Sequence, residues 1–77
     1  MNNALPVLTP REAIRAFSRA GFSVLPNRGK GSHTVMAKAG WPAILTIPDH
    51  AELKRGTLRS LIRDAGLTVE QFRALLD

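Results

Sequence analysis

Cysteine and long apolar runs are missing from this 77-residue sequence, and acidic residues are scarce. Without cysteine, the chain can form neither disulfides nor thiolate metal sites. Its longest apolar run, from Ala43 to Ile47, is interrupted by Thr46 and is far too short to span a bilayer. The first residues also lack the charged and apolar regions of a signal peptide. These absences predict a cytoplasmic protein without a membrane partner.

Aromatic residues are few as well, with three phenylalanines and Trp41. The phenylalanines fit the core, which leaves Trp41, at a predicted hairpin turn, as the candidate for base stacking or a partner contact. This scarcity argues against a sheet that stacks several bases, as the RRM domain does. A chain of this length, residues 1–77, predicts one domain with a small core, so we expect any site to be a shallow surface groove.

Basic residues are abundant, because 11 Lys and Arg stand against 6 Asp and Glu and give a formal charge of +5. Eight of the eleven cations are arginine, the residue that contacts phosphate in a bidentate manner. This balance predicts a polyanionic partner, either nucleic acid or an acidic protein surface. Solubility alone is the alternative explanation of the charge.

Caps and apolar spacing predict a helix followed by three strands. Residues 1–8 are expected to be an irregular lead. Thr9 and Glu12 form a capping box around a proline, and Gly21 ends this first helix, at about residues 10–20. Three short β-prone segments follow, and turns separate them. They are residues 22–25, 32–38 and 43–47. The two hairpins imply a three-stranded antiparallel sheet.

The second half of the chain predicts two helices. Asp49 can cap a short helical turn through Glu52, Gly56 interrupts it, and Thr57 caps the next helix. A second capping box, at residues 68–71, begins a last short helix. The fold class is therefore α+β with the order α-β-β-β-α-α. The helices should cover one face of the sheet and leave the other face more open.

The segment Arg28-Gly29-Lys30-Gly31-Ser32-His33 combines three chemical capacities within six residues. Its glycines let a backbone approach a ligand closely, its cations attract phosphate, and histidine exchanges a proton near neutral pH. We predict that His33 deprotonates an RNA 2′-hydroxyl beside a bound phosphate. The predicted phosphate-binding residues of this segment are Arg28, Lys30, Gly31 and Ser32. The alternative is a partly buried, hydrogen-bonded histidine at the start of a strand.

The second histidine, His50, follows Asp49 at the entrance to the helical half. His50 is a candidate auxiliary acid or base, although Asp49 could instead only cap a helix. The two histidines and Asp49 match no standard pattern of metal ligands. Neither a metal nor another cofactor is therefore predicted.

Arginines repeat every four residues on two of the predicted helices, so each set lines one helix face. The two stripes are Arg55, Arg59 and Arg63, and Arg11, Arg15 and Arg19. An anion bound at the free N–H groups near Gly56 would offset the repulsion between cations and the start of that helix. We predict that Lys54, Arg55 and Arg59 contact the RNA backbone. A solvated helix face is the alternative for each stripe.

Four segments of the chain, in order and at matching spacings, resemble the HicA family. They are Gly21-Phe22, Lys30-Gly31-Ser32-His33, Ile47-Pro48-Asp49-His50 and Leu53 through Ile62. The resemblance begins at about residue 10 and covers nearly all that follows. It implies a double-stranded-RNA-binding-domain-like fold and an mRNA interferase toxin of a type II toxin–antitoxin pair. It also implies inhibition by a HicB-like antitoxin, in complexes that can be of higher order. The functional histidine of the family falls on His33.

The resulting hypothesis is a metal-independent endoribonuclease that cleaves mRNA with His33 as general base. Two other classes of function stay open. The first is a non-catalytic RNA-binding module of the same fold, which would bind RNA in a salt-dependent manner without needing His33. The second is an adaptor for an acidic protein partner, which would bind that partner and show no affinity for RNA.

Overall fold

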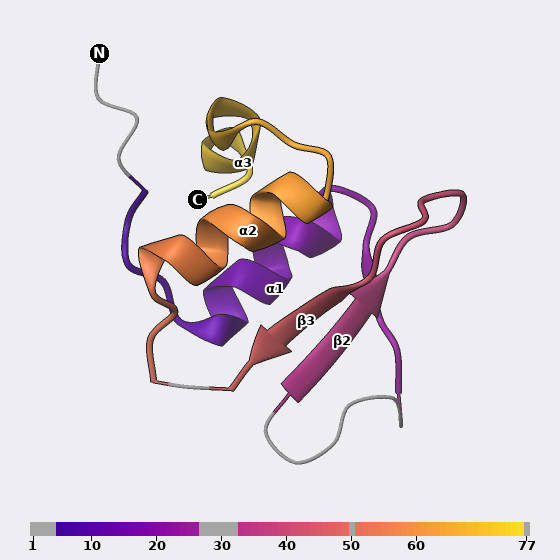
Figure 1. The fold of residues 1–77 in the computed structure, drawn as a ribbon, viewed down its shortest axis with the longest axis horizontal. Helices are drawn as coiled ribbons and strands as arrows, with labels where there is room; N and C mark the ends of the chain where they lie inside the picture. Colours follow the sequence, from indigo (N-terminus) through magenta and orange to yellow (C-terminus); the bar gives the residue numbers. More distant parts are fainter. Residues whose placement is uncertain (1–4, 27–32, 50, 77) are drawn as a thin grey trace.

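A computed structural model describes residues 5–26, 33–49 and 51–76 (Figure 1). The elements are helix α1 (Pro10–Arg19), strands β1 (Ser23–Val24), β2 (His33–Ala37) and β3 (Leu45–Pro48), and helices α2 (Arg55–Asp64) and α3 (Val69–Ala74). The predicted order α-β-β-β-α-α is confirmed. In the described part of the chain, no helix is both long and apolar enough to cross a membrane.

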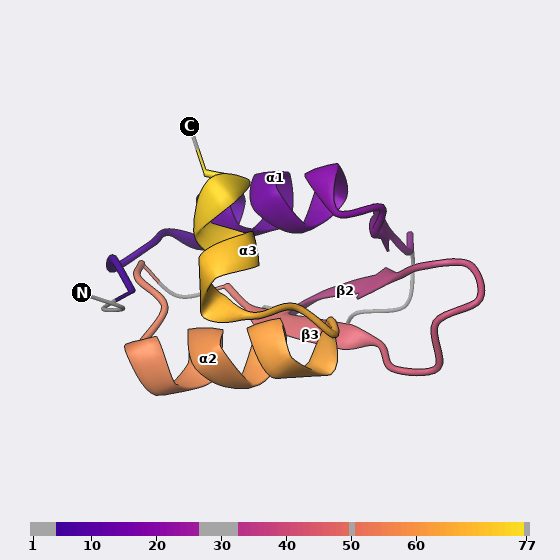
Figure 2. The ribbon, with the colours of Figure 1, turned by 90° about the horizontal axis from the view of Figure 1, so that it is seen from above.

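The three strands form one antiparallel sheet in the order β1-β2-β3, so β2 is the central strand. Contacts between helices and strands come from α1 and α2, and both helices lie on one side of the sheet. Helix α3 packs instead on α2, and Figure 2 shows it between α1 and α2. The predicted two-layer arrangement with a more open sheet face is therefore confirmed, with α3 placed against the other helices.

The core lies between the sheet and the helices, and Phe17 of α1 is fully buried in it. Its ring meets Phe22 edge-on at 6.3 Å and Phe72 at 5.0 Å between centroids. The predicted apolar positions of α2 are all buried; they are Leu58, Leu61, Ile62 and Ala65. The sheet contributes Met36, Leu45 and Ile47. Burial of these side chains supplies the main driving force for folding.

Both predicted capping boxes are present. The hydroxyl of Thr9 accepts from the backbone N–H of Glu12 at 3.2 Å, and the Glu12 carboxylate accepts from the N–H of Thr9 at 2.8 Å. Thr68 and Gln71 make the same reciprocal pair at 3.0 and 2.9 Å. Each box satisfies N–H groups that the first turn of a helix leaves without an intrahelical partner.

The prediction for residues 49–57 is wrong. Residues 51–54 form no helical turn, because Leu53 pairs with Leu8 in an isolated antiparallel bridge and donates its N–H to the Leu8 carbonyl at 2.7 Å. Helix α2 then begins directly at Arg55, and its N-cap, Lys54, makes no side-chain cap. Thr57 is inside the first turn and does not cap the helix.

The N-terminal lead is part of the core. The side chains of Leu5 and Leu8 are buried, which the prediction of an irregular lead did not include. The Leu5 carbonyl accepts a hydrogen bond of 2.8 Å from Nε of Arg55. Residues 5–8 therefore hold the start of α2 in place.

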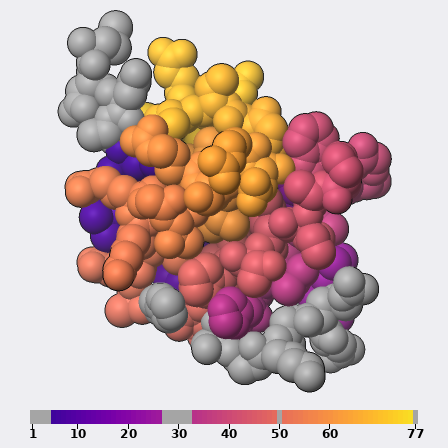
Figure 3. Space-filling view, viewed as in Figure 1, coloured from indigo at the N-terminus to yellow at the C-terminus, as the bar shows by residue number. Residues whose placement is uncertain are grey.

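Strand β3 begins and ends later than the predicted 43–47. It spans Leu45–Pro48, and Pro48 pairs with His33 across β2. Proline is tolerated there because β3 is an edge strand. The N–H group that proline lacks is therefore not needed to pair with a second neighbouring strand. Ala43 and Ile44 belong to the connection from β2, which extends beside α2 as a projecting lobe (Figure 3).

Candidate functional site

His33 is the first residue of the central strand, and its side chain is exposed. Met36 is buried, and alternation along the strand therefore places His33 on the opposite, open face of the sheet. Among the described residues, the imidazole makes no hydrogen bond or ion pair. Its nitrogen atoms are consequently accessible to a bound molecule. The alternative, in which His33 is partly buried and hydrogen-bonded, does not fit this structure.

Five predicted site residues fall outside the described residues, so their roles stay predictions. They are Arg28, Lys30, Gly31, Ser32 and His50. The turn predicted between the first two strands lies in the same gap. Their neighbours in the chain are His33, which begins β2, and Asp49, which directly follows the end of β3, at one end of the sheet.

The start of α2 lies at the same end of the molecule as the start of β2 and the end of β3 (Figure 1). Lys54, Arg55 and Arg59 are exposed there. The first turn of α2 has neither a capping side chain nor an acidic residue, so the positive end of the helix dipole is not offset locally. This combination favours an anion such as a phosphate. The bond from Arg55 to Leu5 fixes where this guanidinium lies.

Trp41 lies at the opposite end of the β2–β3 hairpin from His33, so the fold does not bring these two residues together. The indole Nε1–H donates to the carbonyl of Asp64 at 2.8 Å, and the ring lies against Gly66. Trp41 is 39% exposed. Its described contacts fasten the hairpin to the C-terminal end of α2.

The packing of Trp41 on Gly66 predicts an unequal response to alanine at two glycines. Gly66 and Gly40 have nearly equal φ angles, +76° and +77°, so alanine should cost about 1–2 kcal/mol at each through left-handed strain. A Cβ at Gly66 would also lie 2.6 Å from the Trp41 ring, whereas one at Gly40 would meet nothing within 4 Å. Gly66→Ala should therefore lose about 1–3 kcal/mol more than Gly40→Ala in urea unfolding.

The expected difference between the two glycines should disappear when Trp41 is replaced by alanine. A double-mutant cycle of Trp41→Ala with Gly66→Ala measures this coupling directly. Equal losses for Gly66→Ala and Gly40→Ala in the unmodified background would contradict the packing described.

Within residues 5–26, 33–49 and 51–76, no three His, Cys, Asp or Glu side chains are grouped to hold a metal ion.

Sequence reasoning did not identify Pro48 as the cross-strand neighbour of His33, because strand register depends on pairing across the hairpin. It also missed a groove beside α1 that Arg15 and Arg19 line. The burial of Leu5 and Leu8 could have been predicted, since both are apolar residues that directly precede a strong helix start.

Comparison with known proteins places this small basic α+β protein among bacterial toxins. A chain of a toxin–antitoxin complex from Streptococcus pneumoniae is similar to it, with a TM-score of 0.68 and 36% sequence identity over 77% of this chain and 97% of that chain. Residues 10–67 match the family described as the HicA toxin of bacterial toxin–antitoxin systems. A search of curated protein sequences finds no match.

The match covers well over half of the chain, and the protein therefore belongs to the HicA toxin family. It is a toxin of a toxin–antitoxin system, in a family known as mRNA interferases, and its partner is an antitoxin. The predicted family and fold are thereby confirmed.

Proposed function

We propose that this toxin is a metal-independent endoribonuclease that cleaves mRNA with His33 as general base. The observation that carries the proposal is the accessible imidazole at the start of the central strand, on the open face of the sheet. A surface general base of this kind suits a single RNA strand, which can be laid across a shallow site without an enclosing cavity. Its mRNA substrate makes the cytoplasm the place of action.

In the proposed reaction, an imidazole nitrogen of His33 accepts the proton of a 2′-hydroxyl. The 2′-oxygen attacks the adjacent phosphorus, the bond to the 5′-oxygen breaks, and this oxygen takes a proton from water or from the imidazolium. The products are a 2′,3′-cyclic phosphate and a 5′-hydroxyl end. Arg28 and Lys30 would stabilise the charge on the phosphate, with help from the N–H groups of Gly31 and Ser32.

The RNA backbone would continue toward Lys54 and Arg59 at the start of α2, where an uncapped helix end and exposed cations favour phosphate. Arg55 would act there from the position that its bond to Leu5 sets. His50 stays in the proposal as an auxiliary acid or base. We assign the antitoxin to the HicB-like class, which would shield His33 and these cations with acidic residues in complexes that can be of higher order.

The chemistry predicts the ends of the RNA fragments and their independence of metal. Purified protein should cut a single-stranded RNA in excess EDTA at the same rate as in buffer with Mg²⁺. The 3′ ends should resist a ligase that needs a 3′-hydroxyl, and the 5′ ends should accept phosphate from a kinase without prior dephosphorylation. An RNA whose 2′-hydroxyl groups are replaced by 2′-O-methyl is the matched control and should stay intact.

Loss of cleavage in EDTA, or fragments with 5′-phosphate ends, would contradict the proposed reaction. Tight, salt-dependent RNA binding without any cleavage would instead select the non-catalytic RNA-binding module.

A further inference from the structure

The open face of the sheet carries His33 among uncharged side chains. His33 and Val35 alternate onto this face of β2, and Pro48 and Thr46 of β3 lie directly opposite them. On the other side of β2, the N–H of Leu25 donates to the Val35 carbonyl at 2.8 Å, so the pairing continues past the end of β1. Because residues paired across strands share a face, Leu25 lies beside Val35.

Three apolar side chains of this face form what we call the sheet patch, which consists of Leu25, Val35 and Ala37. All three are partly exposed, and they belong neither to the described core nor to the residues packed against it. Val35 is two residues from His33, which corresponds to about 7 Å along a strand. The base and the 2′-hydroxyl of one nucleotide can therefore reach the sheet patch and the imidazole at the same time.

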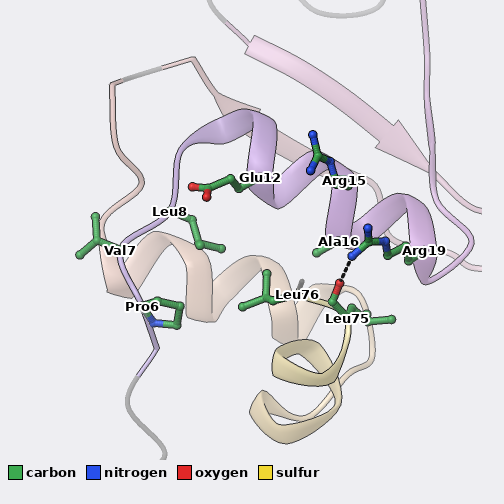
Figure 4. Close-up of a pocket in the computed structure, with 9 residues that line it drawn as sticks. All are labelled: Pro6, Val7, Leu8, Glu12, Arg15, Ala16, Arg19, Leu75 and Leu76. Atoms are coloured by element: carbon green, nitrogen blue, oxygen red, sulfur yellow. Dashed lines mark hydrogen bonds between the residues drawn. The ribbon is translucent and has the colours of Figure 1, made fainter.

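Charged groups are kept off this face. The three described strands contain no lysine, arginine, aspartate or glutamate, although the chain has 11 cations. Lys54 and Arg59 are at the start of α2. Arg15 and Arg19 line a groove between α1 and the end of α3, where Nη1 of Arg19 donates to the Leu75 carbonyl at 2.7 Å (Figure 4). An RNA phosphate thus has partners beside the sheet, whereas the face itself suits the uncharged base.

We propose that the sheet patch receives the base of the nucleotide whose 2′-hydroxyl His33 deprotonates. The inference rests on the proposed function and names the part of the substrate that this site selects. The ribose would lie at His33, the phosphate backbone would run toward the cations of α2, and the base would lie flat on Leu25 and Val35. One base is enough for this patch, in agreement with the scarcity of aromatic residues.

The chemistry of the patch sets the kind of selectivity. Leu25, Val35 and Ala37 have no side-chain donor or acceptor, so they contact the flat face of a base and do not read its edges. The area of the ring then decides how much apolar contact is made. Cleavage should consequently follow purines more readily than pyrimidines, without a distinction between adenine and guanine.

The direct test uses the full-length chain and DNA oligonucleotides that contain a single ribonucleotide, so that cleavage can occur at one position only. The substrates differ in the base of that ribonucleotide, which is adenine, guanine, cytosine, uracil or absent. Values of kcat/KM for the two purines should agree within about twofold, whereas the pyrimidines should be about threefold slower and the abasic substrate about tenfold slower. Equal values for all substrates, the abasic one included, would overturn the proposal.

A pair of valine variants locates the contact. Val35→Ala should slow the adenine substrate about threefold but leave the abasic substrate within about twofold, because the latter has no base to lose contact with. Val24→Ala is the matched control, since Val24 is 47% exposed but pairs with the buried Met36 and so lies on the helix side of the sheet. It should leave both substrates unchanged. Equal slowing of both substrates by Val35→Ala, or the same loss in Val24→Ala, would overturn the proposal.

A binding measurement separates this inference from cleavage by His33. The all-DNA form of the adenine oligonucleotide lacks the attacking 2′-hydroxyl and stays intact. Its titration should shift the methyl NMR signals of Leu25 and Val35 but not those of Val24, and the abasic form should not shift them. If none of the mixed oligonucleotides is cut, or if His33→Ala toxin still cuts them, the His33 proposal fails while these shifts still decide the base contact. Binding without shifts at Leu25 and Val35 would overturn it.

Two other occupants of the sheet patch would give different results. Shifts of the same methyl signals that depend on the concentration of the toxin alone would assign the patch to a second copy of this chain. Shifts that the co-purified antitoxin produces and the oligonucleotide does not would assign it to the antitoxin. Either result would overturn the proposal.

Discussion

His33→Ala toxin is expected to cut RNA at least 100-fold more slowly than unmodified toxin, since general base catalysis contributes about 10²–10⁴ to such reactions. Growth arrest on expression should disappear with the cleavage. The fold should persist, because the imidazole is exposed and makes no hydrogen bond within the described residues. The midpoint of thermal unfolding and the far-UV circular dichroism should match those of the unmodified protein.

Thr46→Ala is the matched control for this experiment. Thr46 is exposed on β3 and lies on the same open face of the sheet as His33, but it has no group that accepts a proton at neutral pH. Its replacement should leave cleavage within about twofold. The His33→Ala variant should still bind RNA with a steep salt dependence, because the cations of α2 remain. Continued toxicity of a folded His33→Ala protein would reject the catalytic role.

Phe72→Ala should produce the largest loss of stability among single changes in α3. The ring is fully buried and packs 5.0 Å from Phe17. Truncation of a buried phenylalanine costs about 3–5 kcal/mol, which is a large part of the stability of a domain this small. The midpoint of urea unfolding should fall sharply, and amide exchange in α3 should approach that of an unstructured chain.

Two variants control for the size and place of this change. Phe72→Leu keeps most of the buried volume and should lose much less than Phe72→Ala. Ala74→Ser, on the exposed side of the same helix, should change the free energy of unfolding by less than about 0.5 kcal/mol. Similar losses for Phe72→Ala and Ala74→Ser would show that α3 is not part of the cooperative core.

Features set by neighbouring residues were predictable from the sequence. The capping boxes at Thr9 and Thr68 involve residues three positions apart, and the glycine ends of α1 and α2 depend on local backbone geometry. The apolar spacing of α2 correctly identified its buried face. These signals were enough to predict the order of the helices and strands, because each involves residues that lie within one or two helical turns of one another.

Features that depend on distant residues were not predictable in this way. The start of α2 is set by the bridge between Leu8 and Leu53, which overrides the local capping signal at Thr57. The start of β3 is displaced by a connection that Trp41 fastens to Asp64. Propensity is a weak guide wherever such tertiary contacts compete with it.

The candidate site was predictable in its chemistry and only partly in its geometry. Strand alternation correctly placed His33 opposite the core-facing Met36. The same reasoning gave no indication that Trp41 is bound to the far end of α2. The sequence does not show which helix the tip of the β2–β3 hairpin will contact, because that contact depends on the twist of the sheet.

The attachment of the N-terminal segment to α2 has a consequence for the timing of synthesis. Arg55 donates to Leu5 across 50 positions, and Leu53 donates to Leu8. The first buried residues to leave the ribosome therefore wait for partners made two-thirds of the way along the chain. Until then, Leu5 and Leu8 stay exposed to water and to chaperones. The N-terminal segment can therefore join the core only after Leu53 and Arg55 have left the ribosome.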